Sequence, residues 1–506
     1  MINGPPRLNT IARPAPADKG FMPHSSSYLR FRKMLWLSGG GLLLFMLTLC
    51  AGNLFLPRHR ALTLPMLGHD FLAFYTAGRF VHEDRPAQMY DLDAVRQFQK
   101  RVIEEAGLET GGGFGPFWNP PFYALALAPL GRLPFAQALR LWWAAGLVAL
   151  LLASVLLCRM FPAGAGWRTR GLVPLLLVLS MPAQQAFTHG QNTFFSLLIL
   201  VVAVVLWRTA AAGRMRTFAS RMAAVGAGMA AGLLAYKPQV GAVVWVAMIL
   251  CLGWRALLGL AITGALLLGA TELFTPGMTA VWLKRLPENL AFMQQQRPYY
   301  WERHVTLKAF WRLLIQQHQT GADLPLVRLL WGLSVLGIAS ALLSTAVRAV
   351  RQQRAVWAAE VCVPPGRSSA AWVEHDRLIS AAVVASPLLV PFYFDYDLLL
   401  AAVAPVLLAV ERTCTPADQQ PPRHQRWLPR MWVVFYAWLL VGPGLVAHLG
   451  VNVTTGLLGC LAVMHITAAG RPFGPDMHRE KTHETEPVAM DRRGAPDNRG
   501  SDRAVP

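Results

Sequence analysis

Long apolar runs separated by short charged breaks dominate the pattern of hydrophobic and polar positions in this chain. About twelve such runs occur, and most approach the roughly 20 residues that a helix needs to cross a hydrocarbon core of about 30 Å. The pattern therefore predicts an all-α integral membrane protein. The predicted spans lie near residues 34–56, 136–158, 171–187, 193–207, 222–236, 238–252, 255–274, 325–347, 378–394, 397–410, 431–449 and 452–468.

The composition supports a membrane protein. Of the 506 residues, 54% are apolar and 15% are charged, against about 25% charged in soluble domains. The net charge is +20, but the basic residues form short clusters and no continuous stripe, so nucleic acid is not expected as a partner. The six cysteines show no metal-ligand spacing, and the sequence has no nucleotide-binding fingerprint. We expect no cofactor, and metal dependence stays open.

The distribution of basic residues predicts the orientation. Most Lys and Arg fall on one set of connections, which the positive-inside rule places in the cytoplasm together with both termini. We expect a basic segment at 1–33, a membrane domain at 34–469 and a disordered tail at 470–506. Arginine is much commoner than lysine, as in GC-rich bacterial genomes, so we expect a bacterial inner membrane.

Two large connections are predicted on the outer side, at 57–135 and 275–324. The first contains two amphipathic stretches, at 71–78 and 91–106, which we expect to lie as helices along the membrane surface. The apolar stretch 120–133 is short and rich in proline, and a full crossing there would invert every later loop. We therefore interpret it as a re-entrant segment.

Several strings, in their order and spacing, resemble one family of membrane enzymes. They are GHDFLAFYTAGRF (68–80), PAQMYD (86–91), FWNPPFYALALAPLGRLPF (117–135), HGQNTFFSLLIL (189–200), AGLLAYKPQ (231–239) and SPLLVPFYFDYDLLLAAVAP (386–405). Together they resemble glycosyltransferase family 87, the polyprenol-phosphate-dependent mannosyltransferases.

This resemblance implies a GT-C-type helical bundle with an active site on the outer face. Its partners would be membrane lipids, a polyprenyl-phosphate sugar donor and a lipid-linked or glycan acceptor, with mannose as the default sugar. The resemblance also implies an acidic catalytic residue in the first outer loop, which by position is Asp70. An ionised carboxylate there can accept a proton from an acceptor hydroxyl. Asp70 is also well suited to cap the helix that follows it.

Polar residues at three other breaks are candidates for binding the donor phosphate or sugar. Lys237 stands beside a proline between two apolar runs, where a cation is costly unless it is paired, binds a ligand or snorkels to the headgroups. His189, Gln191 and Asn192 form another turn, which can serve as hydrogen-bond donors or be simply polar. Arg79 and Arg297 can bind phosphate or remain surface charges.

The remaining candidates are expected to line the acceptor cleft. Asp395 and Asp397 lie at a short outer link, where they can hold an acceptor or pair with basic residues at the rim. Trp118 and Asn119 precede the prolines of the re-entrant bend, and Tyr75 lies on the aromatic face of the first amphipathic stretch.

Two other classes of function remain as alternatives. A secondary transporter of about twelve spans would place ionisable groups near the bilayer midplane and show related halves. A non-catalytic lipid-binding protein would need no particular carboxylate. The candidate polar residues instead gather at one predicted membrane face, which favours the transferase.

Overall fold

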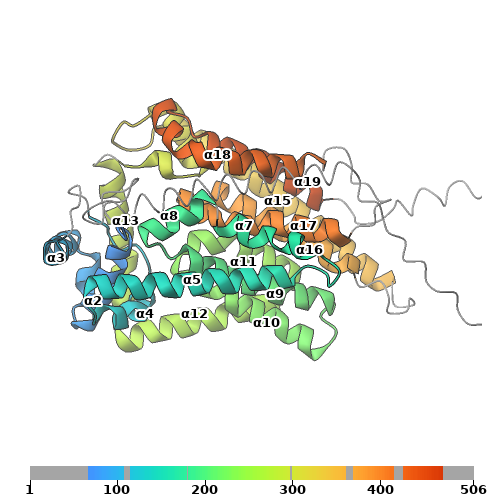
Figure 1. The fold of residues 1–506 in the computed structure, drawn as a ribbon, viewed down its shortest axis with the longest axis horizontal. Coiled ribbons are helices and arrows are strands. Elements are labelled where there is room, and N and C mark those ends of the chain that lie inside the picture. The colour runs from blue at the N-terminus through green and yellow to red at the C-terminus, as the bar shows by residue number, and fades with distance from the viewer. Residues whose placement is uncertain are drawn as a thin grey trace, which may run out of the picture.

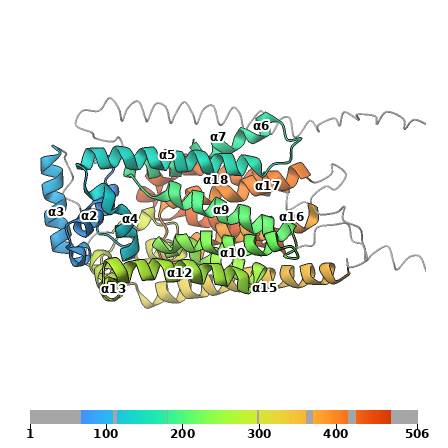
Figure 2. The same cartoon turned by 90° about the horizontal axis from the view of Figure 1, so that it is seen from below.

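The computed structural model describes residues 67–107, 114–178, 180–296, 299–359, 369–414 and 426–470. These residues form a bundle whose long helices run along one common axis, as two perpendicular views show (Figures 1 and 2). In the described ranges, β-structure is limited to an isolated antiparallel bridge between His304 and Phe394. The predicted segment 1–33, the predicted span 34–56 and the tail from 471 lie outside the described residues.

Five helices of the described part are long and apolar enough to cross a membrane. They are α5 (Phe135–Arg159), α9 (Thr193–Ala212), α10 with η3 (Phe218–Gly232 and Leu233–Tyr236), α12 (Trp254–Phe274) and residues 325–352 of α15 (Pro325–Ala359). Three shorter helices follow one another with a bend between the last two, namely α6 (Trp167–Arg170), α7 (Leu172–Val178) and α8 (Met181–His189). Counted together as one span, they bring the number of candidate spans in the described residues to six. The protein is therefore membrane-embedded.

The count of twelve spans is not confirmed. Several predicted runs fold as helices that are not among the candidate membrane spans. They pack inside the bundle or against it. These helices are α11 (Pro238–Leu252), α16 (Ser369–Leu389), η6 (Asp395–Ala402), α17 (Val403–Cys414), α18 (Leu428–Leu449) and α19 (Val453–Ala469).

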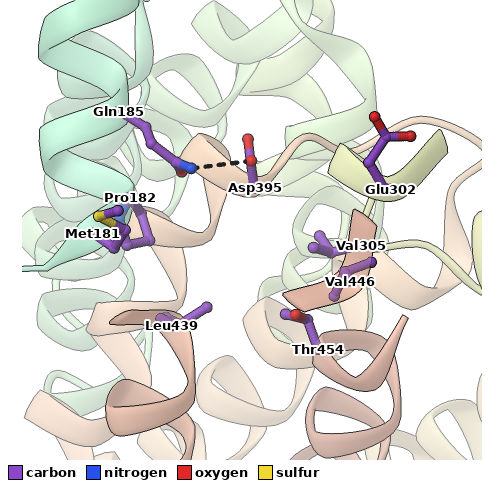
Figure 3. Close-up of a pocket in the computed structure, with 9 residues that line it drawn as sticks. All are labelled: Met181, Pro182, Gln185, Glu302, Val305, Asp395, Leu439, Val446 and Thr454. Atoms are coloured by element: carbon purple, nitrogen blue, oxygen red, sulfur yellow. Dashed lines mark hydrogen bonds between the residues drawn. The ribbon is translucent and has the colours of Figure 1, made fainter. Parts of the chain in front are cut away.

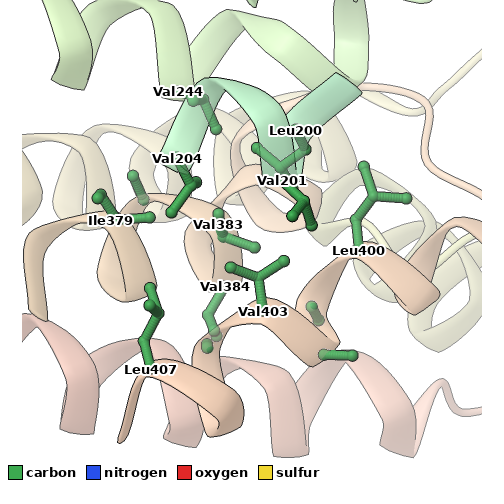
Figure 4. Close-up of a cluster of buried hydrophobic side chains, with 14 of the residues drawn as sticks. Leu200, Val201, Val204, Val244, Ile379, Val383, Val384, Leu400, Val403 and Leu407 are labelled. Carbon is green, nitrogen blue, oxygen red and sulfur yellow. The ribbon is translucent and has the colours of Figure 1, made fainter. Parts of the chain in front are cut away.

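Helix α16 forms the centre of the main apolar core. Branched side chains of α16, α9, α11, η6 and α17 interdigitate there, as Figure 4 shows. A helix that is apolar on all sides gains by being surrounded by other helices. The charged residues of α16 stand near its beginning.

Close backbone contact holds α10 against α12. A Cβ atom at Gly228 would lie 2.1 Å from the carbonyl oxygen of Ala256, and one at Gly259 would lie 2.1 Å from that of Val225. Small residues at such crossings let helices pack tightly where no hydrophobic driving force acts between them. The outer faces of α12 and α15 remain exposed and rich in leucine, including Leu266, which suits contact with lipid.

The two predicted outer loops fold largely as helices at one end of the bundle (Figures 1 and 2). The first contains α2 (Phe71–His82), η2 (Pro86–Tyr90), α3 (Leu92–Glu105) and α4 (Pro121–Gly131). The second contains α13 (Met278–Gln295), η4 (Trp301–Arg303) and α14 (Leu307–Gln316). Helix α4 has 11 residues, about 16 Å at 1.5 Å per residue, which is shorter than the membrane core.

The surface position predicted for α2 is not confirmed. Its predicted aromatic face is buried, but so are Leu72, Ala77 and Phe80. Helix α4 lies directly against α2, where Gly78 and Gly131 let the two backbones touch. Because neighbouring elements cover α2 on more than one side, it forms part of a second apolar core with α3, α4 and the start of α5.

Candidate active site

Asp70 is fixed where α2 meets the end of α8. Its backbone N–H donates to the carbonyl of His189 at 2.9 Å, and the N–H of Gly68 donates to the carbonyl of Thr188 at 2.8 Å. Asp70 occupies the N-cap position of α2, but its side chain makes no capping hydrogen bond. Its Oδ2 accepts instead from Nε2 of Gln191 at 2.8 Å. The carboxylate therefore faces the turn after α8.

A left-handed glycine shapes that turn. Gly190 has φ of 69°, and a Cβ atom there would lie 2.8 Å from Cβ of Phe71. The Gln191 N–H donates to the carbonyl of Ala186, which closes the end of α8. A left-handed residue after the last helical turn is a common helix terminator. Here it brings the His189 carbonyl and the Gln191 side chain to Asp70.

His189 is buried, with 4% of its surface exposed. Its Nδ1 lies 2.8 Å from the carbonyl oxygen of Gln185, one turn earlier in α8. The ring centroid lies 6.0 Å from that of Tyr396.

Asp395 joins three segments around one carboxylate. Arg303 of η4 donates to both of its oxygens, from Nη2 to Oδ1 at 3.0 Å and from Nε to Oδ2 at 3.2 Å. Gln185 donates to Oδ2 at 3.1 Å, which Figure 3 shows beside a small pocket. This paired arrangement fixes the planar guanidinium firmly.

Asp397 forms the second ion pair of this cluster. Its Oδ1 lies 2.7 Å from Nζ of Lys237 and accepts from Thr193 at 2.9 Å. The same ammonium donates to Oδ1 of Asn192 at 3.3 Å. Lys237 is therefore buried and neutralised by its partner, and it does not snorkel.

Tyr396 lies between the two ion pairs. Its ring centroid is 5.1 Å from Nζ of Lys237 and 5.6 Å from Cζ of Arg303. Cations near an aromatic face are stabilised by the ring quadrupole. The ring thus links both cations to His189.

Helix α4, which the sequence predicts as a re-entrant segment, is tied to this cluster by aromatic and amide contacts. Tyr123 of α4 stacks on Tyr236 with centroids 4.7 Å apart and accepts from Nδ2 of Asn192 at 3.2 Å. Asn119 donates to the carbonyl of Tyr236 at 2.7 Å. These contacts hold α4 against the break before α11.

The electrostatics keep Asp70 ionised. Burial by itself raises the pKa of Asp70, but His189, His69, Arg303 and the hydrogen bond from Gln191 together hold it below the ordinary 3.8. Burial opposes the charge of Arg303 as well, but Asp395 and Asp70 raise the pKa of its guanidinium above the usual value. At neutral pH both groups are charged.

Several residues predicted for the site lie elsewhere. Arg79 pairs with Glu83 at 2.5 Å and donates to the carbonyl of Gly131. Tyr75 packs in the second apolar core and donates to the carbonyl of Leu133 at 2.9 Å. Trp118 accepts, through its carbonyl, from the indole of Trp282. These contacts hold helices together and do not reach Asp70. Arg297 lies outside the described residues.

Sequence reasoning missed Arg303, Gln185, Tyr396 and Tyr123. Gln185 is one helical turn before His189, and Tyr396 lies between two predicted aspartates, so their spacing carried a signal. Arg303 shows no local signal, because its partner Asp395 is 92 positions away.

The pocket of Figure 3 adjoins the Gln185–Asp395 hydrogen bond. Its wall is mostly apolar, and its polar members include Glu302 and Thr454. Among the described residues, no three His, Cys, Asp or Glu side chains are grouped so that they could hold a metal ion.

Comparison with known proteins gives one match. Residues 117–363 match the model of Glycosyltransferase family 87. This segment contains His189, Gln191, Asn192 and Lys237, whereas Asp70 precedes it and Asp395 and Asp397 follow it. Neither a curated protein nor a solved structure matches the chain. The matched segment and the membrane helices that it contains make this chain similar to glycosyltransferase family 87, which indicates a glycosyltransferase.

Proposed function

We propose that this protein transfers a hexose, by default mannose, from a polyprenyl-phosphate carrier to a hydroxyl of a lipid-linked or glycan acceptor. The reaction takes place on the outer face of a bacterial inner membrane, with both termini in the cytoplasm and a GT-C-type bundle around the site. The observation that carries this proposal is the Asp70 carboxylate, which makes no capping bond and faces Gln191, His189 and the Arg303–Asp395 pair.

The proposed reaction is a single displacement with inversion. The acceptor oxygen attacks the anomeric carbon, and the bond between that carbon and the phosphate oxygen breaks. Polyprenyl phosphate leaves with the bonding electrons, and the acceptor proton passes to Asp70. A carboxylate in this role usually contributes about 10² to 10⁴ in rate. Asp70 is ionised and thus able to accept this proton.

We assign the leaving phosphate to Arg303 in preference to Lys237. Arg303 uses Nε and Nη2 for Asp395, which leaves Nη1 for a ligand. Its side chain is 26% exposed, whereas that of Lys237 is 8% exposed and is held by Asp397. A guanidinium suits a phosphate because its planar donors match the oxygens. Lys237 and Asp397 then stabilise the break before α11.

The Asp395 carboxylate lines the apolar-walled pocket between α8, α18 and α19. A lipid-borne donor can approach such a site from the bilayer, so that enzyme and donor share the membrane. This arrangement fits a lipid-linked donor better than a soluble nucleotide sugar.

The test compares Asp70→Asn with the matched variant Asp91→Asn in membranes supplied with labelled polyprenyl-phosphate mannose. Asp91 is exposed and caps α3 through bonds to Asp93 and Ala94, a role that asparagine also fills well. We expect Asp70→Asn to lower transfer by about 10²-fold or more and Asp91→Asn to leave it unchanged. Equal transfer by wild type and Asp70→Asn would contradict the proposal and favour a non-catalytic or transport role.

A further inference from the structure

The imidazole of His189 has one nitrogen paired and one unpaired. Nδ1 lies 2.8 Å from the carbonyl oxygen of Gln185. A carbonyl oxygen only accepts hydrogen bonds, so Nδ1 carries the ring proton. In this tautomer Nε2 carries a lone pair and accepts a hydrogen bond. Within the described residues this buried atom has no hydrogen-bond partner.

The unpaired nitrogen belongs to the side chain beside Asp70. The N–H of Asp70 bonds to the carbonyl of His189 at 2.9 Å, which makes the two residues neighbours. Asp70 directs Oδ2 to Gln191, so Oδ1 and His189 Nε2 are acceptors on two neighbouring side chains. A buried acceptor without a partner is costly, and native structures keep such groups mainly where a ligand completes them.

We propose that Nε2 of His189 accepts a hydrogen bond from a second hydroxyl of the acceptor glycan, next to the hydroxyl that Asp70 deprotonates. The ligand class is a sugar with two neighbouring hydroxyls, one reacting and one anchoring. This inference rests on the proposed function. It also replaces the expectation that His189 donates a hydrogen bond to phosphate or sugar, because a neutral ring with Nδ1 protonated has no donor left at Nε2.

Two substitutions separate this role from a purely structural one. In His189→Asn, the amide nitrogen takes the place of Nδ1 and can still donate to Gln185, but nothing stands at the position of Nε2. In His189→Gln, the amide reaches the position of Nε2, and the bond to Gln185 is lost. A structural histidine tolerates the first change better, whereas a hydroxyl-binding histidine tolerates the second better.

The experiment uses the full chain in membranes, labelled polyprenyl-phosphate mannose as donor, and octyl α-mannoside with its monodeoxy analogues as acceptors. With wild type, we expect one monodeoxy analogue to show kcat/KM about tenfold or more below that of the parent. With His189→Asn, parent and analogue should react equally, at the level of the analogue with wild type. His189→Gln should restore part of the preference.

Two results would overturn the inference. One is a transfer rate for His189→Asn that equals the rate of wild type. The other is a ratio of kcat/KM between the parent and the deoxy acceptor that stays the same in His189→Asn as in wild type. The loss caused by removing the hydroxyl would then be independent of the loss caused by removing the imidazole. Asp70→Asn, measured alongside, tests the proposed function separately. If it abolishes transfer while His189→Asn keeps the wild-type preferences, the inference alone fails. If Asp70→Asn transfers at the wild-type rate, the proposed function fails, and the inference that rests on it fails as well.

Discussion

At the scale of single residues, Asp70 depends on neighbours from distant parts of the chain. Its backbone is bound by His189, its carboxylate by Gln191, and its charge is favoured by Arg303. None of these contacts is helical capping, the role that its position beside Phe71 also allowed. The carboxylate is therefore left available for chemistry.

Arg303 provides a residue-scale prediction about the donor. Arg303→Ala should raise KM for the polyprenyl-phosphate donor by about tenfold or more, as expected for a lost hydrogen bond to a charged group. Arg303→Lys should also weaken donor binding, because an ammonium cannot bind Asp395 with two parallel donors and keep a third for phosphate. The measurement is transfer rate against donor concentration.

The matched control for Arg303 is Arg285→Ala. Arg285 is exposed on α13 and pairs with the exposed Glu288 at 3.3 Å, so its loss should change neither KM nor stability. A KM for the donor that stays the same in Arg303→Ala, in protein that folds as well as the control, would argue against phosphate binding by this residue.

At the scale of elements, helix breaks create the site. The chain leaves helical geometry at 190–192 between α8 and α9, at Lys237 between η3 and α11, and at 390–394 before η6. Asn192 and Lys237 stand at the first two breaks, and Asp395 directly follows the third. In a membrane protein such irregular backbone is tolerated where other groups satisfy it or a cavity lies beside it.

Gly190 provides a prediction at this scale. Gly190→Ala puts a side chain on a left-handed residue and a Cβ atom 2.8 Å from Phe71, so it should destabilise the protein by at least about 1–2 kcal/mol. It should also displace α2 and reduce transfer. Thermal unfolding in detergent measures the loss of stability, and transfer of labelled sugar measures the loss of activity.

Gly269→Ala serves as the control, since no atom lies within 4 Å of a Cβ there and alanine favours a helix. Its stability should be equal or slightly higher. Unfolding temperatures that do not differ between the two variants would contradict a structural need for glycine at 190.

At the scale of the whole molecule, the ends of the bundle differ in chemistry. The Asp70 cluster occupies one end of α9, whereas Ala212 lies at the other, 20 residues away, or about 30 Å along a helix. A second set of buried ion pairs, including Arg208–Asp376 and Arg377–Glu411, lies away from the Asp70 cluster.

The proposed orientation is testable with single cysteines in a chain whose own cysteines are replaced. Thr320→Cys, exposed between α14 and α15, should react with a membrane-impermeant maleimide in intact cells. Ala212→Cys, exposed at the far end of α9, should react only after the membrane is opened. The opposite pattern would place the Asp70 cluster in the cytoplasm and remove the proposed outer-face reaction.

Much of the candidate site was predictable because polar residues are easy to recognise in a sequence that consists mostly of apolar runs. Asp70, His189, Gln191, Asn192, Lys237, Asp395 and Asp397 stand at breaks between apolar runs, and the structure brings them together. Their catalytic and binding roles stay predictions. Arg79 and Tyr75 were plausible by residue type, but their side chains turn to partners that sequence spacing does not reveal.

The sequence by itself determined that this chain is helical and membrane-embedded, because the cost of apolar surface in water and of unpaired backbone in lipid is set by each run of residues. Tertiary structure alone decided which carboxylate meets which cation. Asp395 reaches Arg303 and Asp397 reaches Lys237 across 92 and 160 positions. Such pairs form only once packing has fixed the helices, since a charge at a break can pair with any partner that the fold brings near.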